Sequence, residues 1–209
     1  MSRLAAFLDE ADVEPSKGRA GVYVIAAAVV EMERSMVLRS FLRSLVRPED
    51  AEPKHDFARL HVARIKDKRR KGEIIATLGM LRHVTFVVGC AKGYRRTVDR
   101  EPVRRAVMTD MLPWLAKSGV ESTLIELRDT KSLQVADTRT VAALRTADLL
   151  SPQMAVRQGL PSEEPLLWIA DACAAAWRRS MAEGKTNWSQ WYEPHTALID
   201  VPFTGRTGG

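Results

Sequence analysis

The chain has 209 residues, of which 45% are hydrophobic and 28% carry a charge. A chain of this length can bury a core without disulfides or a structural metal, so we expect one domain over residues 1–203, followed by a disordered tail at residues 204–209. No apolar run approaches the roughly 18 residues that span a bilayer, which argues against a membrane protein.

The cysteines and the N-terminus both favour a cytoplasmic protein. Cys90 and Cys173 each lie among apolar residues, as buried reduced thiols do. The apolar stretch near the N-terminus is soon followed by acidic residues and is too short for the core of a signal peptide. We therefore expect neither disulfides nor secretion.

The sequence is basic, with a formal net charge of +6 and a pI near 9.6. The lysines and arginines form runs, and the residues that we expect to bind nucleic acid are Arg64, Lys66, Lys68, Arg69, Arg70, Arg95 and Arg96. Such runs fit the phosphates of RNA or DNA, but each run taken alone also fits a solvated helix face. A nucleic-acid partner is therefore one of two open interpretations.

The first half of the chain predicts a hairpin and two helices. Residues 3–8 form a short apolar run and residues 22–30 a longer one, and the turn-rich connection between them predicts two antiparallel strands. Apolar residues recur at helical spacing over residues 33–46 and, among many basic residues, over residues 61–81. The stretch between these helices, residues 49–60, has two prolines and mixed charge and is predicted to be a loop.

The second half alternates strands and helices. The predicted strands are residues 84–90, 121–127 and 153–157, and the predicted helices are residues 102–115, 138–149 and 162–179. Helical crossovers between strands give parallel pairing. The whole pattern predicts an α/β fold with a mixed β-sheet that is flanked by helices and opens with an antiparallel hairpin.

The last of these helices carries one residue that does not fit its apolar face. Ser162 is expected to cap the helix, and apolar residues such as Leu167 and Cys173 recur along one side. Asp171 interrupts this side, and a buried carboxylate without compensation is strongly unfavourable. Asp171 therefore needs an arginine or lysine, a set of hydrogen-bond donors or a bound cation.

Two further acidic residues fall at predicted strand ends. Asp9 closes the first strand and Glu126 nearly closes the fourth, so parallel pairing of these strands would bring both carboxylates to one edge of the sheet, where Asp171 could face them. Converging carboxylates repel one another unless a cation binds, and hard oxygen ligands select Mg²⁺ or Mn²⁺. Glu10 and Asp129 lie close enough in sequence to add ligands. Each acid taken alone also fits a structural role, in a turn or a salt bridge.

The sequence resembles one protein family in four segments. They are FLDEAD at residues 7–12, VYVIAAAVV at 22–30, LIELRD at 124–129 and EPLLWIADACAAAWRR at 164–179. These segments are similar to the family catalogued as domain of unknown function 3800, whose actinobacterial members carry a Glu-Pro-Leu-Leu-Trp segment. The resemblance implies a ribonuclease-H-like fold with an acidic site, carried here by Asp9, Glu126 and Asp171. The sequence departs from the family where Ala11 and Asp12 replace a common Ser-Gly.

His55 is a further candidate, because related sequences tend to carry a Lys or His near an aromatic residue at this place. A histidine there could position water or protonate a leaving group, although anchoring of the loop is the plainer alternative. The other histidines show no metal-ligand spacing with one another or with the cysteines, so no zinc site is predicted.

These observations predict a nuclease that depends on Mg²⁺ or Mn²⁺ and hydrolyses phosphodiester bonds of RNA or DNA, with Asp9, Glu126 and Asp171 as catalytic residues. The alternative is a non-catalytic module on the same fold that binds nucleic acid or protein, with Asp171 merely salt-bridged. A phosphoesterase acting on small anionic substrates would share the metal site. The sequence has no motif for ATP hydrolysis, dinucleotide binding or serine hydrolysis.

Overall fold

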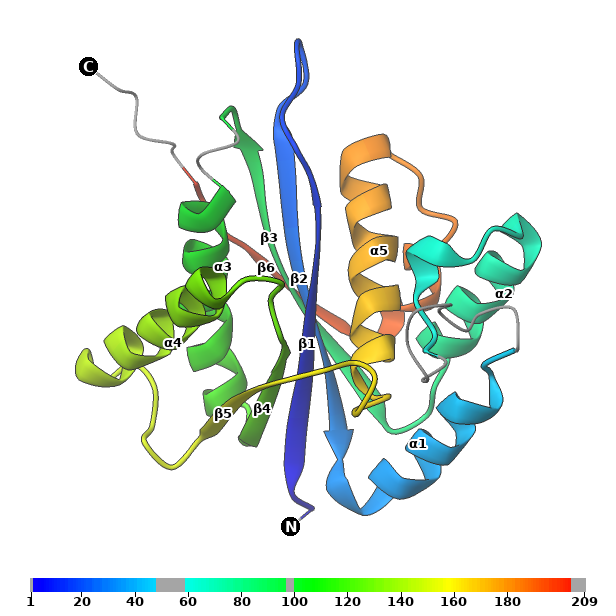
Figure 1. Ribbon diagram of the computed structural model, residues 1–209, viewed down its shortest axis with the longest axis horizontal. Coiled ribbons are helices and arrows are strands. Elements are labelled where there is room, and N and C mark those ends of the chain that lie inside the picture. Colours follow the sequence, from blue (N-terminus) through cyan, green and yellow to red (C-terminus); the bar gives the residue numbers. More distant parts are fainter. Residues whose placement is uncertain (1, 48–58, 97–99, 204–209) are drawn as a thin grey trace.

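The computed structural model describes residues 2–47, 59–96 and 100–203. These residues form a sheet with the strand order β5-β4-β1-β2-β3-β6 (Figure 1). The strands are β1 (Leu4–Val13), β2 (Gly21–Glu31), β3 (Val84–Tyr94), β4 (Val120–Glu126), β5 (Ala155–Gly159) and β6 (Thr196–Asp200). β2 is antiparallel to both β1 and β3, whereas β4 is parallel to β1, β5 to β4 and β6 to β3. The predicted α/β fold, with its mixed sheet and opening hairpin, is confirmed at this level.

Helices cover both faces of the sheet (Figure 1). The main helices are α1 (Ser35–Ser44), α2 (Lys68–Gly79), α3 (Arg100–Lys117), α4 (Lys131–Thr146) and α5 (Leu167–Glu183), and the short 3-10 helices are η1 (Met32–Arg34), η3 (Val62–Arg64), η5 (Ser189–Trp191) and η6 (Glu193–His195). α1, α2 and α5 pack on one face, and α3 and α4 pack on the other. The central strand β2 is buried on both sides, which explains its unbroken apolar run.

The hairpin of β1 and β2 is longer than the sequence predicts. The two strands stay in register from Leu4 opposite Glu31 to Val13 opposite Val22, and an isolated bridge joins Ser16 to Arg19 beyond them. The end of the hairpin projects above the rest of the sheet (Figure 1). Asp9 is therefore in the middle of β1, and the prediction that it closes the strand is wrong.

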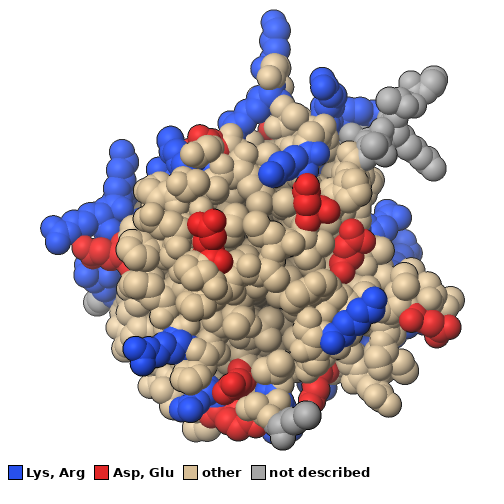
Figure 2. All heavy atoms as spheres, turned by 180° about the vertical axis from the view of Figure 1, so that it is seen from behind, with Lys and Arg blue, Asp and Glu red and all other residues tan. Residues whose placement is uncertain are grey.

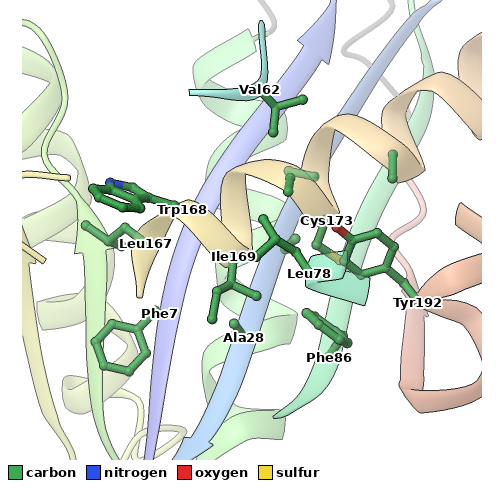
Figure 3. Close-up of a cluster of buried hydrophobic side chains, with 14 of the residues drawn as sticks. Phe7, Ala28, Val62, Leu78, Phe86, Leu167, Trp168, Ile169, Cys173 and Tyr192 are labelled. Atoms are coloured by element: carbon green, nitrogen blue, oxygen red, sulfur yellow. The ribbon is translucent and has the colours of Figure 1, made fainter. Parts of the chain in front are cut away.

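α5 packs against the sheet through buried hydrophobic side chains (Figure 3). Leu167, Ile169 and Cys173 are buried in the core that the helix shares with β1, β2 and β3. On the same side, the ring of Tyr192 stands edge-on to the ring of Phe86, with centroids 4.9 Å apart. This packing fixes the position of α5 and of the polar residues that it carries.

The beginning of α5 differs from the prediction. The helix starts at Leu167 and has no side-chain cap, so Ser162 is not its N-cap. The turn before it is held instead by Glu164, which accepts a hydrogen bond from the backbone N–H of Leu166 at 3.1 Å and pairs with Arg39 at 2.7 Å. The indole N–H of Trp168 also donates to the carbonyl of Pro161 at 2.7 Å.

Other elements also differ from the sequence prediction. The basic stretch predicted as one helix from residue 61 contains η3 and then α2, whose first turn is capped by the carboxylate of Asp67. The strand β6, at the edge of the sheet beside β3, is not anticipated by the sequence pattern.

None of the helices in the described ranges is both long and apolar enough to cross a bilayer. His55 and the predicted tail at residues 204–209 lie outside the described residues.

Candidate acidic site beside the free end of β4

The site forms where β4 ends and β1 continues. The parallel register pairs Leu8 with Ile125, so the residues that follow, Asp9 and Glu126, are neighbours on adjacent strands. Strand residues alternate between the two faces of a sheet, which puts Asp9 on the same face as Phe7, the face that α5 covers. The condition under which Asp9 and Glu126 would meet, parallel pairing of these two strands, is therefore fulfilled.

Asp171 meets these two residues from α5. Asp9, Glu126 and Asp171 line one cavity of about 400 Å³, and Glu10 and Asp129 line it too. Three carboxylates from a strand, a strand end and a helix are thus brought together from positions far apart in the sequence. The cavity also exposes apolar side chains, among them Leu127 and Leu133.

The electrostatic environment of Asp9 is unfavourable for its charge. Burial raises the pKa of this carboxyl well above its usual range, and the neighbouring charges of Asp171 and Glu126 raise it further. A side-chain hydrogen bond with Glu126 acts in the same direction, and Arg104 opposes the effect. Without a cation, the carboxyl of Asp9 is therefore favoured in its protonated form.

Asp171 has hydrogen-bond donors as partners. Its Oδ2 accepts the backbone N–H of Val62 at 2.9 Å and lies 3.1 Å from Nδ1 of His61. Both donors come from the segment that opens η3, and the side chain of Asp171 is only 16% exposed. Of the three kinds of partner that Asp171 could have, the structure thus has hydrogen-bond donors. These donors bind Oδ2, so Oδ1 of Asp171 can make other contacts.

His61 is the site residue that the sequence pattern does not reveal. It lines the cavity with the three acids, although it is 110 residues from Asp171 in the chain. Metal-ligand spacing, the pattern that would single out a histidine, is absent around it. The signal in the sequence is indirect, since Asp171 needs a donor and His61 stands among the basic residues of its segment.

Glu10 points to the other face of the sheet, as its position next to Asp9 in a strand requires. Its carboxylate pairs with Arg104 and lies 3.5 Å from the guanidinium of Arg128. Arg104 is itself buried and makes two hydrogen bonds of 2.8 Å to Asp137 of α4. The charge of Glu10 is therefore already compensated, which makes it a poorer metal ligand than the sequence suggests.

The predicted nucleic-acid contacts are not all on the surface. Arg70 is buried and donates to the backbone carbonyl of Leu45, so its guanidinium is not presented on the surface as the other predicted contacts are. Arg69 is exposed but pairs with Glu73 one turn along α2. The remaining predicted residues, Arg64, Lys66, Lys68, Arg95 and Arg96, are exposed, as is Asp129 at the mouth of the cavity.

In the part of the chain that the structure describes, no three or more His, Cys, Asp or Glu side chains are arranged as a ready-made metal site. The donor set itself suits a hard cation, because Asp9, Glu126 and Asp171 offer carboxylate oxygens and no soft ligand. The raised pKa of Asp9 means that a proton relieves the repulsion in this arrangement. Binding of a cation would replace that proton and require the carboxylates to turn toward one point.

The comparisons with known proteins add no relative: no model of a protein family matches the chain, and no curated protein matches it either.

Proposed function

We propose that the protein is a nuclease dependent on Mg²⁺ or Mn²⁺ that hydrolyses phosphodiester bonds in RNA or DNA. Asp9, Glu126 and Asp171 are its metal ligands and catalytic residues. The observation that carries the proposal is that these three carboxylates line one cavity and that the pKa of Asp9 is raised by burial and by the other two. Natural proteins gather like charges in this way mainly at functional sites.

Two further observations support the proposal. A sheet whose antiparallel strands β1 to β3 are joined to the parallel strands β4 and β5 is compatible with the ribonuclease-H-like fold that the family resemblance implies. The segments that carry this resemblance contain the same three acids.

The side chains divide the work of the site. A bound divalent cation supplies the charge that activates water and stabilises the leaving oxygen of a phosphodiester. The parallel register of β1 and β4 sets Asp9 beside Glu126, and α5 brings Asp171 to them. His61 and the N–H of Val62 hold one oxygen of Asp171, so this carboxylate is oriented before any ligand arrives.

The direct test is cleavage of labelled single-stranded and duplex RNA and DNA with and without Mn²⁺. The wild-type protein should cleave at least one substrate only when Mn²⁺ is present, and Asp171→Asn should lose about 100-fold or more of this activity. Asp110→Asn, at an exposed acid on α3, is the matched control and should cleave normally. Equal activity of Asp171→Asn and wild type would remove the proposal.

A second candidate function has its own observation. The donors on Oδ2 of Asp171 satisfy part of that carboxylate without a metal, which also fits a non-catalytic module that binds nucleic acid or protein. Such a module would bind its partner and show no cleavage at any concentration of Mn²⁺. The cleavage assay therefore separates the two functions.

A further inference from the structure

The acidic site lies at one end of a path that leads to a basic surface. β1 and α5 run side by side in the same direction, from the level of the acids toward the projecting hairpin (Figure 1). Along α5, Ala175 and then Arg178 follow Asp171 at helical spacing. Along β1, Ala11 follows Asp9 on the same face and packs against the α5 core. Small residues thus line the path between the acids and the hairpin.

Basic side chains gather where the path ends. We define the hairpin surface by Lys17 and Arg19 of the hairpin tip, Lys92, Arg95 and Arg96 at the end of β3, and Arg178 of α5. Three segments meet there, because Lys92 is the register partner of Val22 and the guanidinium of Arg19 donates to the carbonyl of Ala182 in α5 at 3.3 Å. Figure 2 shows Lys and Arg side chains on and around the projecting hairpin.

The positive charge of the hairpin surface is largely uncompensated. Glu183 forms ion pairs with Lys185 at 3.1 Å and with Arg179 at 3.9 Å, and neither of these residues is part of this surface. Asp12 pairs with Arg100. Glu14 is the exposed acid nearest to the tip in the chain. Among the residues that the structure describes, no ion pair within 4.0 Å joins an acid to Lys17, Lys92 or Arg178, although the charge of Arg178 helps to lower the pKa of Glu183 and opposes the rise in the pKa of Asp12. An uncompensated basic surface of this kind attracts a polyanion.

We infer that the hairpin surface binds the phosphate backbone of a nucleic-acid strand several nucleotides away from the acidic site. The inference rests on the proposed function for the identity of its partner. Lys17 lies eight residues after Asp9, and four of these steps are in β1, so an extended chain between the two would span about 26 Å. With one phosphate per about 3.4 Å of axis in each strand of a duplex, this length spans several nucleotides. The surface therefore selects long substrates over short ones.

The test is a binding measurement that does not depend on cleavage. Anisotropy of a labelled single-stranded oligonucleotide is measured in EDTA over a series of salt concentrations, for wild type and for the triple variant Lys17→Gln, Lys92→Gln, Arg178→Gln. Removal of one basic side chain that binds a phosphate of a single strand lowers the salt slope by about 0.7. The triple variant should therefore have a slope smaller by about 2 and bind at least about tenfold more weakly at low salt.

Two further variants make the result specific. Arg105→Gln, Lys117→Gln, Arg139→Gln removes the same net charge from exposed positions on α3 and α4 and should bind within about twofold of wild type. Lys17→Arg, Lys92→Arg, Arg178→Lys keeps the three charges and should bind like wild type, which excludes misfolding as the cause of the weaker binding. Equally weak binding by the two glutamine triples, or no binding by wild type, would overturn the inference.

An assay with a small substrate distinguishes failure of this inference from failure of the proposed function. The hairpin triple variant should hydrolyse bis(p-nitrophenyl) phosphate at the wild-type rate in Mn²⁺ and show a raised KM for long strands, because the small ester does not reach the hairpin. If wild type binds strands through the hairpin surface and hydrolyses nothing in Mn²⁺, the nuclease proposal fails and the binding surface stands. If the triple variant keeps the wild-type KM for long strands, the hairpin surface does not bind the substrate, and the proposal for the acidic site is unaffected.

Discussion

Asp171 has one carboxylate oxygen that is fixed by hydrogen bonds and a second that can bind a ligand. Its Oδ2 is engaged by His61 and by the N–H of Val62, and its side chain is mostly buried in a helix that otherwise contacts the core. Hydrogen bonds to a ligating carboxylate orient it and affect metal affinity. His61 is thus a positioning residue for Asp171.

His61→Ala should weaken Mn²⁺ binding by about tenfold or more, because Asp171 is then oriented by the N–H of Val62 without the imidazole. The measurement is a titration of free Mn²⁺ by its EPR signal. His195→Ala, at an exposed histidine of η6, is the control and should bind as wild type does. Unchanged affinity in His61→Ala would show that Val62 alone suffices or that Asp171 binds no metal.

Asp9 destabilises the metal-free fold at neutral pH. Its pKa in the folded state is raised above the ordinary value of 3.8, so as the pH rises the unfolded chain releases its proton first and the fold loses stability. Asp9→Asn removes this loss. In EDTA at pH 7 the variant should melt about 2–4 °C higher than wild type, for a gain of about 1 kcal/mol, and the difference should shrink as the pH falls toward 4.

The thermal melts have a simple control in Asp110→Asn, which should track wild type at both pH values because Asp110 is exposed. A gain in Asp9→Asn of the same size at pH 4 and pH 7 would show that the charge of Asp9 is not its cause. Lower stability of Asp9→Asn than of wild type at pH 7 would contradict the burial argument altogether.

At the scale of elements, a buried ion pair joins the two helices on the face opposite α5. Arg104 of α3 makes two bonds of 2.8 Å to Asp137 of α4 and also pairs with Glu10 of β1. Both partners in the Arg104–Asp137 pair are almost fully buried. Such a pair ties α3, α4 and β1 together directly behind the acidic site.

Arg104→Met should destabilise the protein by about 3–5 kcal/mol, because it leaves Asp137 and Glu10 with reduced compensation in a buried place. Urea unfolding measures the change. Arg105→Met, one residue along α3 and exposed, should change stability by no more than about 0.5 kcal/mol. If the two substitutions have equal effects, the ion pair does not hold these elements together.

Elements that bury a clear apolar pattern could be predicted from the sequence, and elements fixed by distant contacts could not. The hairpin follows from its two apolar runs, and crossover rules predict parallel strands in the second half, which makes a meeting of Asp9 with Glu126 conditional on β1 and β4 being neighbours. β6 is a short, partly exposed edge strand with little pattern of its own. His61 reaches Asp171 only through the tertiary fold, which periodicity does not encode.

Two features that the sequence pattern does not anticipate have local causes. The beginning of α5 lies later than predicted because Glu164 and Trp168 fix the preceding turn through side-chain contacts that replace a cap. Glu10 pairs with Arg104 because the alternation of a strand sends neighbouring side chains to opposite faces. In both cases the residue types suit the predicted role, and contacts beyond the segment set the geometry.

Over the whole molecule, the acidic site and the hairpin surface are separated along the direction of β1. The three carboxylates lie where β4 ends, and the hairpin surface lies where the long pair β1 and β2 projects beyond the sheet. This arrangement suits a polyanion that is held by its backbone at one place and hydrolysed at another. The proposed function depends on the acidic end, since a basic surface alone would only bind.

The most direct test of a metal site at these acids is anomalous diffraction from a crystal of the protein soaked in Mn²⁺. The account predicts an anomalous peak bounded by the carboxylates of Asp9, Glu126 and Asp171, and no such peak in a soaked crystal of Asp171→Asn. A wild-type crystal that shows no peak there at millimolar Mn²⁺, with His61 and Val62 still on Asp171, would contradict the account.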